Sequence, residues 1–417
     1  MDVYLLPAVV GGGLGDIEEV LAAGRELARA GFPTLLYRRP GHPLPRSVDG
    51  PWDWPRYVRL DRLRPRAPAA LTISPAWGIS AAPTRNEAFG RGGPWEVECA
   101  DIERTYGPRS TLHVSLEEFA RTLPSVGEDR ERLREGGIGH RDLGARLRRS
   151  RREGELERFR AAFHRFRAFD RPNVLHVFAG FERNTRFARE FPNAVQTGPL
   201  WSRAPTGTRA RARSVEWVWY ASPASAEHLA FRILEGLSAA RSPRHLYVRS
   251  PRPWKIALPS DRVELDTGSV RPAEWRRRFA GADLRIVTGS RTLLEALELG
   301  RPFLYFNGTL GAATRTRRHR PEKIVALLSV LRQQDVSPDV IRDLSDFARG
   351  RRVPEVVRRA ADRSDGWSRF PRRVRPVGFR APYEDAGRLI VRTARALARA
   401  PQQAEEIVDR VRAGTPL

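Results

Sequence analysis

The sequence has almost no cysteine, very little lysine and no long apolar run. Its 417 residues include a single cysteine, Cys99, which excludes a disulfide framework within the chain and disfavours a cysteine-based zinc site. No uninterrupted apolar run approaches the roughly 20 residues that a membrane helix needs. The chain opens on a strand-like run, Val3 to Leu6, with no basic or apolar leader before it. These absences favour a cytoplasmic protein.

Arginine carries nearly all of the positive charge. The sequence has 72 arginines but only two lysines, Lys255 and Lys323, and its formal net charge is +25. Such a ratio is typical of a coding bias that places arginines on solvated faces. It also fits attraction to an anionic partner, such as an acidic membrane surface contacted by the arginine-rich segment 146–152, or a phosphorylated substrate. Nucleic acid is disfavoured because no binding motif accompanies the charge.

The hydrophobic pattern predicts two α/β domains. A chain of 417 residues suits two domains of about 200 residues each. In the first, a strand, a glycine-rich turn, a helix that ends at Gly31 and a second strand form a β-turn-α-β unit, which indicates a parallel sheet. The strands expected in this half lie at residues 3–10, 33–37, 71–74, 174–178 and 194–196.

A second α/β block follows a linker at residues 201–213, which is rich in Ser, Pro, Thr, Gly and Arg. The alternation of strands and helices predicts a second parallel sheet. Its expected strands lie at residues 215–220, 246–248, 263–265, 284–288 and 302–306, and the last long helix of the chain at about 384–400.

Three turns rich in small residues follow predicted strands and open helices. They are Gly11 to Asp16, Ser222 to Ser225 and Gly289 to Thr292. The free N–H groups and the positive end of a helix both favour a bound phosphate. In open parallel sheets, ligands bind at the carboxyl ends of the strands. These turns therefore predict an anionic ligand, although each also fits a plain strand-to-helix turn.

Two segments resemble a known family. The spacing Gly289-x-x-Thr292-x-x-Glu295-Ala, between Ala-Asp and Gly300-x-Pro302, resembles the donor-binding segment of GT-B glycosyltransferases, most of all the group with the bacterial peptidoglycan N-acetylglucosaminyltransferase. The run 12–16, Gly-Gly-Leu-Gly-Asp, is similar to the glycine-rich loop of starch and glycogen synthases. It also matches the Gly-Gly-x-x-Gly-His loop of the peptidoglycan enzyme, with aspartate at the histidine position.

The resemblance implies an α/β fold with two Rossmann-like parallel-sheet domains that face a central cleft. Residues 1–200 would be the acceptor side, 214–382 the nucleotide-sugar donor side, and 383–417 a C-terminal helix that crosses back to the N-terminal domain. It implies a hexosyltransferase that moves a sugar from a nucleotide sugar, such as a UDP-sugar, to a hydroxyl of a glycan, lipid or small molecule. It implies no cofactor and no metal.

The resemblance also implies roles for the donor segment. Gly289, Ser290 and Thr292 match the turn that holds the donor phosphates. Glu295 matches the glutamate that binds the ribose diol, where a carboxylate can accept two hydroxyl hydrogen bonds. Arg291 would offset charge on the leaving group. A solvated helix position is the alternative interpretation of Glu295.

Three further residues complete the expected donor side. Ser222 and Ser225 belong to the second anion-binding turn. Arg249 follows a strand of the second domain and would also offset charge on the leaving group. All three would lie at the carboxyl edge of the same sheet.

In the glycine loop, which also contains Leu14, the resemblance implies that Gly12, Gly13 and Gly15 let the backbone approach the donor or acceptor closely. Asp16 is the candidate base that removes the proton of the acceptor hydroxyl. The alternative is that Asp16 only caps the helix, which contributes about 1 kcal/mol.

Departures from the family pattern favour an inverting mechanism. Retaining members usually carry a second glutamate eight positions before the ribose-binding one, and Val287 stands there. The lysine expected before the glycine loop of glycogen synthases is replaced by Val9 and Val10. Other functions stay open: a nucleotide-sugar epimerase or a non-catalytic binder on the same fold, and a basic nucleic-acid-binding protein.

Histidines supply no obvious catalytic set. His176 lies within an apolar strand, which favours a hydrogen-bonded core histidine. His113 and Glu182 are expected at strand ends or in loops, where either could face a ligand.

Overall fold

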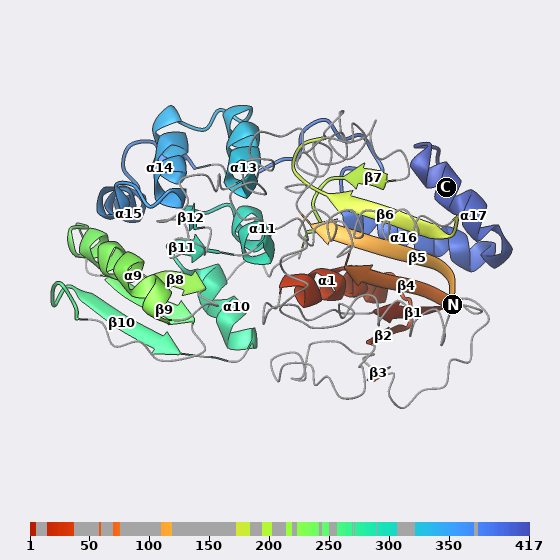
Figure 1. Cartoon of the computed structure of the whole chain (residues 1–417), viewed down its shortest axis with the longest axis horizontal. Helices are drawn as coiled ribbons and strands as arrows, with labels where there is room; N and C mark the ends of the chain where they lie inside the picture. The colour runs from red at the N-terminus through yellow and green to blue at the C-terminus, as the bar shows by residue number, and fades with distance from the viewer. Residues whose placement is uncertain are drawn as a thin grey trace, which may run out of the picture. The chain divides into compact units, whose positions relative to one another are not determined.

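The computed structural model describes two compact units. The N-terminal unit comprises Met1–Leu200 and Gly378–Leu417, and the C-terminal unit comprises Trp201–Val377 (Figure 1). The residues described are 1–5, 15–36, 58–59, 70–75, 110–118, 172–183, 194–201, 214–218, 223–241, 244–249, 257–268, 270, 272–288, 290–306, 322–370 and 374–417.

The N-terminal unit is built on a parallel sheet of seven strands in the order β3-β2-β1-β4-β5-β6-β7. Every neighbouring pair is parallel. The order reverses direction between β1 and β4, which is the switch point of a doubly wound sheet. The elements are β1 (Asp2–Leu5), α1 (Gly15–Arg29), β2 (Thr34–Leu36), β3 (Val58–Arg59), β4 (Ala70–Pro75), β5 (Ser110–Glu118), β6 (Val174–Ala179) and β7 (Ala194–Thr197).

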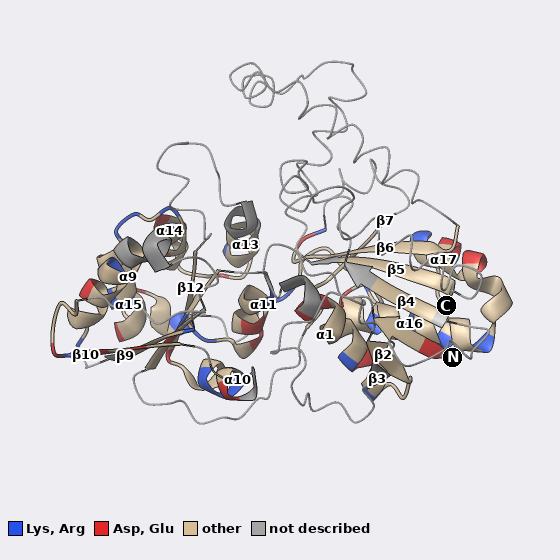
Figure 2. Cartoon of the chain, turned by 60° about the horizontal axis from the view of Figure 1, so that its bottom comes forward, with Lys and Arg blue, Asp and Glu red and all other residues tan. Residues whose placement is uncertain are grey.

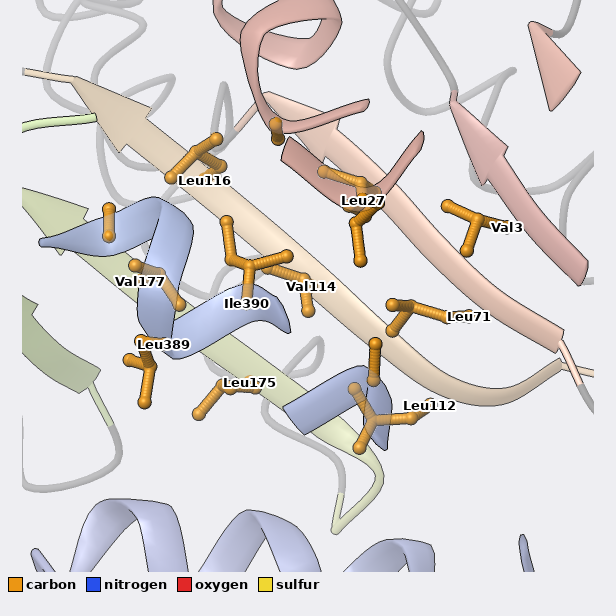
Figure 3. Close-up of a cluster of buried hydrophobic side chains, with 14 of the residues drawn as sticks. Val3, Leu27, Leu71, Leu112, Val114, Leu116, Leu175, Val177, Leu389 and Ile390 are labelled. Atoms are coloured by element: carbon orange, nitrogen blue, oxygen red, sulfur yellow. The ribbon is translucent and has the colours of Figure 1, made fainter. Parts of the chain in front are cut away.

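One face of this sheet is the hydrophobic core of the unit. Alternate strand residues share a face because side chains alternate along a strand. Leu27 of α1 and the C-terminal helix α16 (Ala386–Arg399) cover that face, with Leu389 and Ile390 over the strands in Figure 3. The strand residues labelled there are Val3, Leu71, Leu112, Val114, Leu116, Leu175 and Val177.

Backbone pairing holds the returning C-terminal segment on β7. The Gly198 N–H donates to the Tyr383 carbonyl oxygen at 2.7 Å, and the Ala386 N–H donates to the Gly198 carbonyl oxygen at 3.2 Å. A Cβ at Gly198 would lie 1.8 Å from the Glu384 carbonyl oxygen. Only glycine fits so close an approach of two backbones.

The chain then continues in α16, the 3-10 helix η4 (Pro401–Gln403) and α17 (Ala404–Arg412), all in the N-terminal unit. The Asp385 carboxylate caps α16 by accepting from the Arg388 N–H at 3.1 Å. Figure 1 shows the blue α16 and α17 beside the orange and yellow strands.

The C-terminal unit has a parallel sheet of five strands in the order β10-β9-β8-β11-β12. All of its pairs are parallel, and its switch point lies between β8 and β11. Its elements are β8 (Ser214–Val218), α9 (Pro223–Ser238), β9 (Arg244–Arg249), β10 (Val263–Gly268), α10 (Pro272–Gly281), β11 (Leu284–Val287), α11 (Ser290–Leu299) and β12 (Phe303–Tyr305).

The outer helices of this unit are α13 (Glu322–Arg332), α14 (Pro338–Ala348), α15 (Val353–Asp362) and the 3-10 helix η3 (Trp367–Arg369), and a buried carboxylate joins the last three. Asp343 is fully buried. It accepts a hydrogen bond from the Trp367 indole N–H at 3.0 Å. It also pairs with Arg352 at 3.2 Å and with Arg359. The carboxylate thereby connects α14 to α15 and η3.

The predicted fold class, two Rossmann-like parallel sheets with a C-terminal helix that returns to the first, is confirmed. The central strand β5 and the helices between residues 322 and 370 were not predicted from the sequence. In β5 the apolar residues alternate with Thr111, His113 and Ser115. Buried parallel strands are usually recognised by a continuous apolar run, which β5 lacks.

Candidate functional site

The candidate site lies at the switch point of the C-terminal sheet. β8 and β11 are neighbours, with Val215 opposite Leu284 and Trp217 opposite Ile286. Their carboxyl ends, Val218 and Val287, therefore lie at one edge of the sheet. Helices α9 and α11 begin soon after these ends. Two helix N-termini are thus brought to one edge, and the start of a helix carries partial positive charge and N–H groups that have no partner within the helix itself.

Three predicted donor-binding residues lie in the first two turns of α11, where two are buried and one is half-buried. Arg291 is 3% exposed and Thr292 is 7% exposed. Glu295 is half-buried, and it lies one turn along the helix from both, on the same face. Ser290 is the first residue of α11, while Gly289 lies outside the described residues.

Arg249 ends β9 at the same edge, opposite Val218 of β8. Its guanidinium carbon lies 5.4 Å from the ring centroid of Trp275 in α10, a cation–π contact that holds the side chain. Trp275 is itself buried and packs 6.4 Å from the Tyr247 ring, centroid to centroid. The aromatic pair therefore supports Arg249 near the carboxyl edge.

Two buried residues of opposite charge, which were not recognised from the sequence, lie on neighbouring strands below this edge. Glu216 of β8 lies opposite Arg285 of β11, and both are fully buried. Arg285 donates to the carbonyl oxygens of Phe279 at 2.7 Å and Ala280 at 2.9 Å, at the end of α10. Burial lowers the pKa of Arg285 to about 9. The signal in the sequence was a charged residue within each apolar strand.

The other predicted donor residues are described only in part. Ser225 lies in the first turn of α9, where the structure describes the backbone but not the side chain. Ser222 lies outside the described residues. The site as described is therefore built from α9, α11, Arg249 and the strand ends between them.

In the N-terminal unit, α1 begins at Gly15, after β1 at that sheet's own switch point. Asp16 is the second residue of α1 as the structure bounds the helix. The structure does not describe the Asp16 side chain. Gly12, Gly13 and Leu14 lie outside the described residues.

Two histidines lie inside the N-terminal sheet. His113 is 6% exposed within β5, and its Nδ1 lies 2.7 Å from the Thr72 hydroxyl oxygen. His176 is 1% exposed within β6. Burial, and then the charge of His176, lowers the pKa of His113 to about 3. Burial, and then the charge of Arg412, lowers the pKa of His176 to about 3.

Both histidines are therefore neutral at pH 7. The expectation that His113 lies at a strand end or in a loop is wrong, because it is a core residue of a central strand. Glu182 is exposed just beyond the carboxyl end of β6.

Two kinds of feature are absent from the residues that the structure describes: a membrane-spanning helix and a metal-binding cluster. No helix among them is both long and apolar enough to cross a membrane. Nor do they bring together three or more His, Cys, Asp or Glu side chains that could hold a metal ion.

No protein-family model matches the sequence, and neither does any curated protein. Among solved structures, the chain is similar to the calicheamicin glycosyltransferase CalG4, with 14% identity, a TM-score of 0.42, and 98% of this chain and 99% of that one covered. It is similar to Phytolacca americana UGT2, complexed with UDP-2-fluoro-glucose and pterostilbene, with 12% identity, a TM-score of 0.49 and 99% of both chains covered.

A third similar structure is TcCGT1 in complex with UDP, with 11% identity, a TM-score of 0.47, and 98% of this chain and 99% of that one covered. These identities and TM-scores are low. The fold is therefore established by the chain's own strand orders and by its returning C-terminal helices.

Proposed function

We propose that the chain is a GT-B glycosyltransferase that moves a sugar from a nucleotide-sugar donor to a hydroxyl acceptor. The observation that carries the proposal is the position of the donor-like segment. Its helix, α11, starts directly beyond β11 at the switch point of the C-terminal sheet, where doubly wound sheets bind their ligands. The sequence motif and the topology, two independent kinds of observation, thus agree on one edge.

In this proposal the diphosphate lies at the N-termini of α9 and α11. Backbone N–H groups there, with Ser290 and Thr292, would donate hydrogen bonds to phosphate oxygens. Arg249 and Arg291 would offset the negative charge that grows on the leaving diphosphate. Glu295, one turn further along α11, would accept hydrogen bonds from the two ribose hydroxyls.

The proposed reaction is a single displacement that inverts the anomeric carbon. The acceptor oxygen forms a bond to that carbon while the bond from the carbon to the diphosphate oxygen breaks, and the diphosphate leaves with the electron pair. Asp16 would take the proton of the acceptor hydroxyl. The positive helix ends and arginines would supply the charge stabilisation, so the proposal includes no metal.

The first test is a thermal-shift screen of the full chain against UDP, GDP, ADP, CMP and their common sugar conjugates. A ligand at a hundred times its dissociation constant stabilises a protein by about 2.7 kcal/mol, which raises Tm by about 5–10 °C for a unit of this size. We expect a shift for one nucleotide family. We expect Glu295→Ala to lose it and Glu298→Ala, on the same helix, to keep it.

The second test separates an enzyme from a binder. Asp16→Asn should keep the donor-induced thermal shift and lower sugar transfer by about 10²–10⁴-fold. A donor shift without transfer by the unaltered chain would favour a non-catalytic binder, and interconversion of nucleotide sugars would favour an epimerase. No shift with any nucleotide, or a shift that Glu295→Ala leaves unchanged, would contradict the proposed donor site.

A further inference from the structure

The exposed face of α16 carries a straight row of arginines. Arg388, Arg392, Arg395 and Arg399 are all exposed, and their spacing of four, three and four residues puts them on one side of the helix. At a rise of about 1.5 Å per residue, the row is about 16 Å long. The opposite side of α16 is buried in the core through Leu389, Ile390, Thr393, Ala394 and Leu397.

Within α16 itself the row has no acidic neighbour; the carboxylate nearest to it along the chain is that of Asp385, which caps the helix. Among the α-helices that the structure describes, α16 alone contains no Asp or Glu. Within the described part of the chain, none of the four arginines forms an ion pair; other exposed arginines do, for example Arg342 with Asp339 at 3.4 Å. A coding bias toward arginine explains their number but not this segregation.

The next helix has the opposite character. α17 exposes Glu405, Glu406 and Asp409, and Figure 2 shows red segments on it. Asp409 pairs with Arg412 of the same helix at 3.6 Å. The arginine row is therefore a local feature of α16 and not a general property of the C-terminal elements.

We propose that the arginine row of α16, at positions 388, 392, 395 and 399, docks the protein on the phosphate headgroups of an anionic lipid bilayer. Clusters of about four to eight basic residues on an amphipathic helix are typical of anionic lipid recognition. A guanidinium can donate two parallel hydrogen bonds to one phosphate. A row on the outside of a helix can contact a flat surface along its whole length.

The chemistry of the row favours a bilayer over a single-stranded nucleic acid. Sites for single strands interleave positive charge with aromatic rings on which bases stack, whereas α16 has no aromatic residue. The exposed positions of α16 also lack the large apolar side chains that insert into a membrane. The docking is therefore electrostatic, reversible and weakened by salt. It rests on α16 alone and is independent of the proposed function.

The experiment is co-sedimentation of the full chain with vesicles of phosphatidylcholine, alone or mixed with phosphatidylglycerol. The row variant is R388Q/R392Q/R395Q/R399Q, since glutamine keeps helix propensity and the buried face is untouched. The matched control is R332Q/R349Q/R351Q/R369Q, which removes four exposed arginines of the C-terminal unit that form no ion pair among the described residues. Both variants lose the same charge.

We expect the unaltered chain to bind the anionic vesicles and not the neutral ones, and salt to release it. Each arginine removed from the row should lower the partition coefficient about fivefold, and all four by on the order of 100-fold or more. The control should bind nearly as well as the unaltered chain. A variant with lysine at the four positions keeps the charge and should also bind. If the fourfold glutamine variant loses its circular dichroism signal and therefore does not fold, the single variant Arg395→Gln takes its place in the binding measurement.

Three results would overturn the proposal. The unaltered chain could ignore anionic vesicles, or the row and control variants could lose binding equally, which would assign the attraction to net charge. A duplex DNA retained through the row, with no vesicle binding, would assign the row to nucleic acid instead.

Discussion

The two parallel sheets share a doubly wound strand order but bury different polar groups. The N-terminal sheet buries two histidines, His113 and His176, in neutral form. The C-terminal unit buries charged residues, Glu216 opposite Arg285 in the sheet and Asp343 with its arginines in the outer helices. A shared topology therefore does not fix the chemistry of the interior. The two units should respond differently to mutation and to acid.

The largest loss of stability is expected from a substitution in the C-terminal unit. Asp343→Ala would leave Arg359 and the Trp367 indole without their buried acceptor, and breaking a buried pair in this way costs about 3–5 kcal/mol. Urea unfolding followed by circular dichroism measures the loss. Asp339→Ala, whose ion pair with Arg342 is exposed, is the control and should cost at most about 1 kcal/mol. Equal losses in the two variants would show that the buried network is not what joins α14 to α15.

The corresponding test in the N-terminal unit introduces a steric clash. Gly198→Ala would place a Cβ against the Glu384 backbone, and relieving that clash should cost about 3 kcal/mol and loosen the returning segment. Gly387→Ala meets the Glu26 Cγ at 2.9 Å and the Leu200 Cδ1 at 3.2 Å. These side chains can shift, so its cost should be smaller. Hydrogen exchange of α16 amides would report the loosening, and unchanged exchange in Gly198→Ala would contradict the contact.

The unfolding free energies of the two units should respond differently to acid. The folded pKa values of His113 and His176, about 3, lie below the unfolded value of 6.5. Below pH 6.5 the unfolded chain therefore binds protons that the folded chain does not, and stability falls as pH falls from 6.5 toward 3. The expected slope is about 1.4 kcal/mol per pH unit for each histidine. The unfolding free energy of the N-terminal unit, measured from pH 7 to 4, gives this slope.

His176→Leu should reduce that slope by about half. His245→Gln, in β9 of the C-terminal unit, should leave it unchanged. A slope that is the same in all three proteins would mean that other groups dominate the acid response.

The smallest losses of stability are expected from removing helix caps, and they should be similar in the two units. The Asp385 side chain caps α16 by accepting from the Arg388 N–H at 3.1 Å, and the Ser337 hydroxyl caps α14 by accepting from the Asp339 N–H at 3.3 Å. Replacing either cap by alanine should cost about 1 kcal/mol. Thermal unfolding of the two variants tests whether local helix chemistry, unlike the buried polar groups, is shared by both units.

The sequence alone predicted most of the strands and helices that form the two sheets, because apolar runs and helical spacing are local signals. It missed β5, where His113 and Ser115 interrupt the apolar run. Their burial depends on strands β4 and β6, which come from distant parts of the sequence. The pairing of Glu216 with Arg285 was missed for the same reason, since it depends on the register of two strands far apart in the chain.

The candidate site, like the fold, could be predicted from the sequence only in part. The motif from Gly289 to Glu295 can be found in the sequence, and so can the arginine spacing of α16. That α9, α11 and Arg249 reach one edge of the sheet follows only from the order β9-β8-β11.

What the sequence by itself determined is the pair of α/β blocks and their element types, because the periodicity of apolar side chains encodes these directly. The residues proposed to bind a nucleotide sugar rest instead on the resemblance of short motifs. Only the tertiary structure decided which strands are neighbours, which face of α16 is buried, and where the C-terminal segment docks. Those depend on contacts such as Gly198 against Glu384, between residues almost two hundred positions apart, and no local pattern encodes such a contact.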